Sequence, residues 1–93
     1  MIRSFRDPRV RQILDGQVPK RFPPDLLRAA ERRLNMLDLA TTIADLTAPP
    51  SNRLERLSGD RAGQWSIRIN RQWRICFRWE DDGAHDVEIV DYH

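Results

Sequence analysis

Residues 65–79 read WSIRINRQWRICFRW, and their alternating pattern decides the predicted fold. Successive side chains of a β-strand point to opposite faces, so residues two apart share a face. The bulky side chains would therefore line one face of a sheet: Trp65, Ile67, Ile69, Trp73, Ile75, Phe77 and Trp79. The opposite face would then show Arg68, Arg74 and Arg78, which predicts an arginine-rich surface behind an apolar core.

Further strands and turns are expected around this pair of strands. Asn70-Arg71 is typical of a tight turn, and Asp81-Asp82-Gly83 is typical of a hairpin. Residues 53–57 predict a short strand before the glycine-containing turn at 59–63, and residues 87–92 predict the last strand. Residues 2–5 alternate weakly and could form a short first strand.

Two helices are expected ahead of the strands. Asp7 and Pro8 are typical of a helix start, and Gly16 is typical of its end. The second helix should open at Pro23-Pro24 and reach about residue 39. Its apolar stripe has helical spacing and consists of Leu27, Ala30, Leu34 and Leu37, with Leu26 flanking it. Residues 42–46 predict one further helical turn.

These elements predict an α+β fold in which two N-terminal helices pack on an antiparallel twisted sheet. Ninety-three residues suit a single domain spanning 1–93. The lone cysteine, Cys76, excludes an internal disulfide and is expected to be a small packed residue instead of a nucleophile. The chain has neither a signal-like opening nor an apolar run of about 18 residues, which favours a cytoplasmic protein without membrane contact.

Charge is distributed unevenly along the chain. Residues 1–33 and 52–79 each carry a net charge of +5, whereas residues 34–51 carry −2 and residues 80–93 carry −6. Lys20 is the sole lysine among 16 basic residues. Arginine binds phosphate through two N–H groups and stacks on bases, so this composition suits RNA.

The sequence offers few other routes to chemistry. Two histidines and one cysteine do not form a metal-ligand pattern, and no phosphate-binding glycine loop or serine elbow occurs. We therefore expect no cofactor and no metal. RNA cleavage by 2′-OH attack needs proton transfer and stabilisation of phosphorane charge, for which arginine, tyrosine and histidine remain.

Four segments of the chain resemble the HigB toxins of the RelE/ParE-like superfamily. They are MIRSF (1–5), GDRAGQWSIRIN (59–70), WRICF (73–77) and VEIVDYH (87–93). The resemblance covers essentially the whole chain. It implies a metal-independent endoribonuclease that cleaves mRNA in the ribosomal A site. It also implies a helix-turn-helix HigA antitoxin, through which alone the protein would reach operator DNA.

The resemblance also implies site residues. Arg74 matches the catalytic arginine of the family, and Tyr92 and His93 match its functional C-terminal pair. Some members carry His and Lys where this chain has Glu55 and Ser58. Glu55 is either a base or an ion-pair partner of an arginine, and Ser58 cannot replace a cation.

Several of these assignments keep an alternative. The RNA-binding candidates are Arg56, Arg61, Arg68 and Arg78, although Arg68 and Arg78 are also typical of solvated sheet residues. Tyr92 and His93 could simply form a frayed terminus. Two other functions remain open, a ParE-like poison of DNA gyrase and a non-catalytic RNA-binding regulator.

Overall fold

The structure is a computed structural model that describes residues 1–92 of the chain. Within these residues the α-helices are α1 (Pro8–Leu14) and α2 (Pro24–Leu39). The strands are β1 (Glu55–Arg56), β2 (Gln64–Arg68), β3 (Trp73–Glu80) and β4 (Gly83–Asp91). They form one antiparallel sheet in the order β1-β2-β3-β4. Short 3₁₀ turns lie between the elements: η1 (Ile43–Thr47), η2 (Pro50–Asn52) and η3 (Gly59–Arg61).

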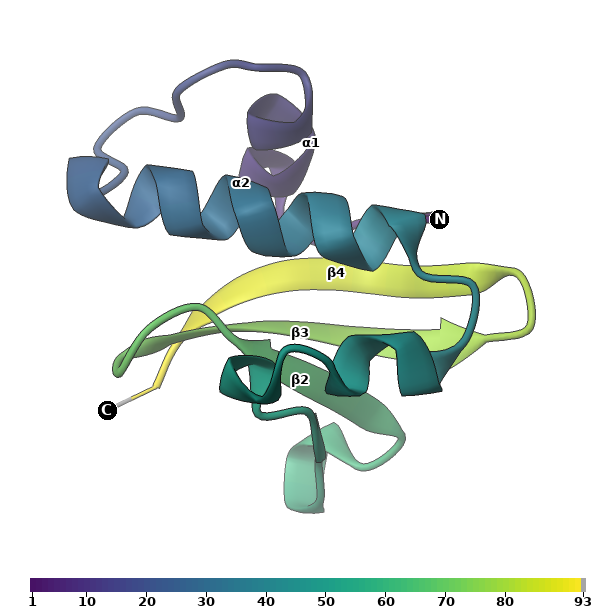
Figure 1. Cartoon of the computed structure of the whole chain (residues 1–93). Coiled ribbons are helices and arrows are strands. Elements are labelled where there is room, and N and C mark those ends of the chain that lie inside the picture. Colours follow the sequence, from purple (N-terminus) through teal and green to yellow (C-terminus); the bar gives the residue numbers. More distant parts are fainter. Residues whose placement is uncertain (93) are drawn as a thin grey trace.

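The core lies between the helices and one face of the sheet. Both α-helices are on the same side of the strands, and η3 lies at the opposite side of the view, beyond β2 (Figure 1). The helix side of the core contains Val10, Ile13, Leu26, Ala30, Leu34 and Leu37. The sheet side contains Ile67, Ile75, Phe77, Val87 and Ile89. The predicted apolar sheet face is therefore confirmed, with Trp65, Trp73 and Trp79 partly buried at its margins.

Local signals explain most helix boundaries. Asp7 accepts a hydrogen bond from the backbone N–H of Arg9 and so caps α1, with Pro8 in the first turn. The predicted span of α2 is confirmed, but its buried stripe contains Leu26 in place of Leu27, which is only half-buried. None of the helices in residues 1–92 is long and apolar enough to cross a membrane.

The last strand differs from its prediction. β4 begins at Gly83, not at 87. The prediction missed residues 83–86 because a bulge opposite residues 76–78 interrupts the alternation. Asp86 adopts a φ of 54° at this irregularity. Ala84 and Val87 are therefore both buried in the core although they are three residues apart. A strict period of two cannot detect such a strand.

The N-terminal segment runs beside β4 without forming a regular strand. Isolated parallel bridges join Ile2 to Ala84 and Phe5 to Val87. The expected first strand at residues 2–5 is thus reduced to these two contacts. They cover part of the outer edge of β4, which limits pairing with other chains there.

Candidate active site

The sheet face opposite the helices carries a row of four residues in cross-strand register. Glu55 of β1 pairs with Ser66 of β2, Ser66 pairs with Cys76 of β3, and Cys76 pairs with Glu88 of β4. Directly paired residues share a face. Ser66 and Cys76 are fully buried in the middle of the row. Two glutamates therefore flank a small neutral centre, and their backbones are three inter-strand spacings, or roughly 14 Å, apart.

Arg74 lies on this face beside Ser66. Its Nε donates to Ser66 Oγ at 2.8 Å, and its Nη2 donates to the carbonyl oxygen of Arg53 at 2.6 Å. The same Nη2 is 3.9 Å from Glu55 Oε1. The expectation of a fully open arginine face is wrong here, because Arg74 is only 9% exposed. Its guanidinium lies along the sheet toward the Arg53 backbone instead of standing out into water.

Arg61 reaches the same face from η3. Its Nη1 donates to Gln64 Oε1 on β2 at 3.1 Å and to Glu88 Oε1 on β4 at 2.6 Å. Since β3 lies between β2 and β4, the guanidinium of Arg61 crosses β3. The hydrogen bond from Arg61 to Glu88 raises the pKa of the arginine above its usual value, so the group stays charged.

Tyr92 follows the last residue of β4 and lies on the same face, beside Cys76. Its backbone N–H donates to the carbonyl oxygen of Gln72, and its hydroxyl is 4.0 Å from Cys76 Sγ. Burial raises the pKa of Tyr92 above its ordinary 10.0, and Cys76 adds to the shift. Burial likewise raises the pKa of the Cys76 thiol. At neutral pH the phenol is therefore a proton donor and the thiol is un-ionised, as expected for a packed cysteine.

The predicted site residues fall into two groups. Glu55, Arg61, Arg74 and Tyr92 come together on this face. His93 lies outside the described residues. Of these four residues, the alternating pattern predicted only that Arg74 lies on the face opposite the core.

The side chains of the other predicted RNA contacts bond to residues outside this group. Arg56 is paired with Trp65 and places its guanidinium over that ring, 5.6 Å from the centroid, so it is associated with the opposite face. Arg78 bonds Asp86 at 2.8 Å and also pairs with Glu80, near the β3–β4 turn. Arg68 neighbours Arg74 in register, but its Nε bonds the carbonyl oxygen of Asn70.

Sequence reasoning missed Glu88 and Ser66 as parts of the site. Alternation already places Glu88 on the same side as Tyr92, which was a usable signal. Nothing local indicates that Ser66 accepts a hydrogen bond from Arg74, because that contact depends on the register between β2 and β3. Contacts of this kind require the paired strands.

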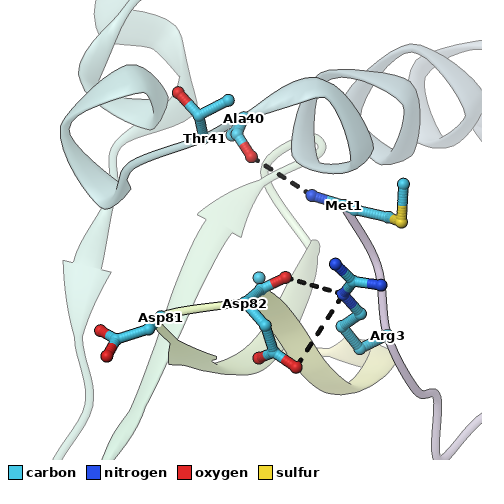
Figure 2. Close-up of a pocket in the computed structure, with 7 residues that line it drawn as sticks. Met1, Arg3, Ala40, Thr41, Asp81 and Asp82 are labelled. Carbon is cyan, nitrogen blue, oxygen red and sulfur yellow. Dashed lines mark hydrogen bonds and ion pairs between the residues drawn. The ribbon is translucent and has the colours of Figure 1, made fainter.

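A pocket of about 260 Å³ lies elsewhere, at the β3–β4 turn. Figure 2 shows the α-amine of Met1 bonded to the Ala40 carbonyl, and Arg3 reaching both the carbonyl and the carboxylate of Asp82. This turn is at the opposite end of β4 from Tyr92. The pocket is therefore separate from the sheet face that carries Arg61 and Arg74. Residues 1–92 contain no group of three or more His, Cys, Asp or Glu side chains placed to hold a metal ion.

The cluster has the groups that phosphodiester chemistry requires. Arg61 and Arg74 supply fixed positive charge, which stabilises a phosphorane. Tyr92 supplies a proton donor, and Glu55, with a side chain that is 58% exposed, supplies a carboxylate acceptor. Together they offer cations for a phosphate and groups for proton transfer.

The chain matches a known protein family and curated relatives. A family model described as the RelE-like toxin HigB of type II toxin–antitoxin systems matches residues 3–93. The chain is 38% identical over 85 residues to Toxin HigB-1 of Vibrio cholerae serotype O1, covering 90% of each protein. It is 32% identical over 93 residues to Endoribonuclease HigB of Proteus vulgaris, covering 100% of each.

Solved structures support the same fold. A chain of the YoeB-YefM complex from Staphylococcus aureus matches with a TM-score of 0.61 and 15% identity, over 100% of this chain and 98% of that one. At this identity the match speaks for the fold alone. The predicted RelE/ParE-like α+β architecture is confirmed.

Proposed function

This chain belongs to the HigB-like toxins of type II toxin–antitoxin systems, and we propose that it is an endoribonuclease that cleaves mRNA on the ribosome. A toxin of this class acts with an antitoxin as its partner. The observation that carries the proposed chemistry is the meeting of Arg61, Arg74 and Tyr92 on one face of the sheet. Its site of action would be the cytoplasm, where ribosomes and mRNA are found.

The proposed reaction is an internal transfer. The 2′-oxygen attacks the adjacent phosphorus, and Glu55 accepts the 2′-OH proton. Arg74 stabilises the charge of the phosphorane, because its Nη1 makes no hydrogen bond within residues 1–92 and remains available to a phosphate oxygen. Tyr92 protonates the departing 5′-oxygen, so the products are a 2′,3′-cyclic phosphate and a 5′-hydroxyl. His93, the final residue, is assigned to proton transfer at the same site.

The proposed partners follow from family membership. A HigA-type helix-turn-helix antitoxin would inhibit the toxin and carry the complex to operator DNA. The ribosome would supply both positioning of the mRNA and further phosphate contacts.

End-mapping on purified components tests the function. Wild-type protein should cut mRNA bound to ribosomes, leave 5′-hydroxyl ends and cut free mRNA poorly. Glu55→Gln should slow cleavage by about 100-fold, since it removes the base. Glu80→Gln is the matched control, because Glu80 pairs with Arg78 away from the site. Uncut mRNA together with inhibited DNA gyrase in a parallel supercoiling assay would overturn the proposal.

A further inference from the structure

Arg61 and Glu88 form a link that the sequence pattern does not explain. Arg61 lies in the turn between β1 and β2, whereas Glu88 lies in the middle of β4. Their side chains meet at 2.6 Å across the face of β3, and both are largely sheltered, with 31% and 17% of the side chain exposed. The contact draws the guanidinium over the centre of the site.

The hydrogen bonds of Arg61 leave a specific set of donors available. Within residues 1–92, both of its side-chain hydrogen bonds come from Nη1, to Gln64 and Glu88, while Nε and Nη2 make none. The guanidinium has five N–H donors in a rigid plane, so fixing Nη1 also fixes the direction of the others. Arg61 is therefore anchored on one side and open on the other.

Arg74 shows the same arrangement. Its Nε and Nη2 are anchored by Ser66 and Arg53, and Nη1 makes no hydrogen bond among the described residues. Burial raises the pKa of both Tyr92 and Cys76, and the charges of Arg61 and Arg74 act against this rise. The two arginines thus lie on the same face and near the same phenol.

We propose that Glu88 is a positioning residue that holds Arg61 as the second phosphate-binding cation of the site, opposite Arg74. The ligand class is a phosphodiester of single-stranded RNA, bound by the unused N–H groups of both arginines. This inference rests on the proposed function, because it assigns a role within the same site.

The role of Glu88 depends on an acceptor atom more than on a charge. In Glu88→Gln, the amide oxygen can still accept from Arg61 Nη1, so the arginine stays in place. In Glu88→Ala, the anchor on β4 is lost, and Arg61 keeps only Gln64. The two substitutions therefore separate positioning from simple charge pairing.

Binding and cleavage should be measured separately on the whole chain. Binding uses a 2′-O-methyl RNA oligonucleotide, which has no 2′-OH and cannot be cut, followed by fluorescence anisotropy over a range of salt. Cleavage is followed by single-turnover kinetics on ribosome-bound mRNA over a range of protein concentrations. The maximal rate constant and the half-saturating concentration are then obtained separately. Thermal unfolding of every variant shows whether it remains folded, and Glu80→Ala is the matched glutamate control.

We expect Arg61→Ala and Glu88→Ala each to reduce the single-turnover rate by about 100-fold, while Glu88→Gln stays within about threefold of wild type. The double variant should be no slower than either single variant, because the two residues act as one unit. Arg61→Ala should also reduce the salt slope of oligonucleotide binding by about 0.7, the loss of one phosphate contact.

Folded Glu88→Ala that cleaves and binds like wild type would overturn the inference, as would additive losses in the double variant. Failure of the nuclease proposal has a different signature. If wild-type protein cuts no mRNA but oligonucleotide binding still falls in Arg61→Ala and Glu88→Ala, the anion site stands without the assigned reaction.

Discussion

Arg74 Nε donates to the buried hydroxyl of Ser66 at 2.8 Å, and this bond sets the direction of the guanidinium on the sheet face. The arginine is thus part of the folded interior as well as a proposed contact for the substrate. Its second anchor is the Arg53 carbonyl, at 2.6 Å. Substitution of Arg74 consequently affects stability as well as chemistry, and the choice of replacement decides which of the two is measured.

Arg74→Lys should lower the cleavage rate by about 100- to 1,000-fold with little change in fold. A lysine ammonium keeps the charge, but it cannot reach Ser66 and the Arg53 carbonyl while leaving a planar N–H for phosphate. Single-turnover cleavage and far-UV circular dichroism measure the two effects. Arg3→Lys is the control, because Arg3 pairs with Asp82 at the far end of β4. Full activity in Arg74→Lys would contradict the role assigned to the guanidinium.

Arg74→Ala should, in addition, destabilise the protein by about 1–3 kcal/mol, because it leaves Ser66 and the Arg53 carbonyl without their partner. Urea unfolding measures this cost. A variant as stable as wild type would mean that the two hydrogen bonds are readily replaced by water.

Tyr92→Phe should slow cleavage by about 100-fold or more, because it removes the proton donor and keeps the ring. The chain has one tyrosine, so absorbance of the tyrosinate at alkaline pH reports this group alone. Burial raises the pKa of Tyr92, so its titration midpoint in the folded protein should lie above the ordinary 10.0. The same titration in denaturant is the control, and a lower midpoint in the folded state would contradict the raised pKa of Tyr92.

Removal of His93 should reduce cleavage and leave the unfolding temperature nearly unchanged, since a final residue adds little to the core. His93→Gln shows whether cleavage needs the imidazole ring or only a polar side chain at this position. Cleavage at the wild-type rate by the shortened chain would exclude a catalytic role for this histidine.

Asp7→Asn should destabilise the protein by about 1 kcal/mol at pH 7. Burial alone would raise the pKa of Asp7, but hydrogen bonds from Arg9 and from the Ile89 N–H outweigh it, so the pKa lies below 3.8. A carboxylate with a depressed pKa contributes stability above the unfolded pKa and loses it as pH falls through the folded one. The difference between wild type and variant should therefore shrink below pH 4 in urea unfolding. Asp15→Asn, at an exposed ion pair, should change stability by less than about 0.5 kcal/mol at either pH.

Gly83→Ala should destabilise the N-terminal contact with β4 by about 1–3 kcal/mol. A Cβ at position 83 would lie 2.0 Å from the Met1 carbonyl oxygen, and Gly83 has a φ of 132°. Hydrogen exchange at Arg3 and Ala84, whose amides bond across this contact, should rise with the loss of stability. Gly63→Ala is a useful comparison, because Gly63 also has a positive φ, of 90°, but no atom lies within 4 Å of the added Cβ. Equal effects in the two variants would mean that backbone strain, not the clash, is responsible.

Strong local periodicity made much of the fold predictable. The span of α2 and the two faces of β3 followed from spacing alone, because burial of an apolar stripe is the main free-energy gain of each element. β4 shows the limit of this reasoning. The bulge at Asp86 depends on pairing with β3, so alternation could not show that residues 83–86 belong to β4, although Asp81-Asp82-Gly83 predicted the turn itself.

The amino-acid sequence by itself determined which side chains share a side of the sheet, because the pleat has a period of two wherever the chain is extended. It thereby placed Arg74 opposite the core. Only the tertiary structure decided what those side chains touch. Strand register brought Ser66 to Arg74, and the path of the turn at 59–61 brought Arg61 to Glu88. Such contacts join residues far apart in the chain, and no local pattern specifies where the end of a long, flexible arginine will be held.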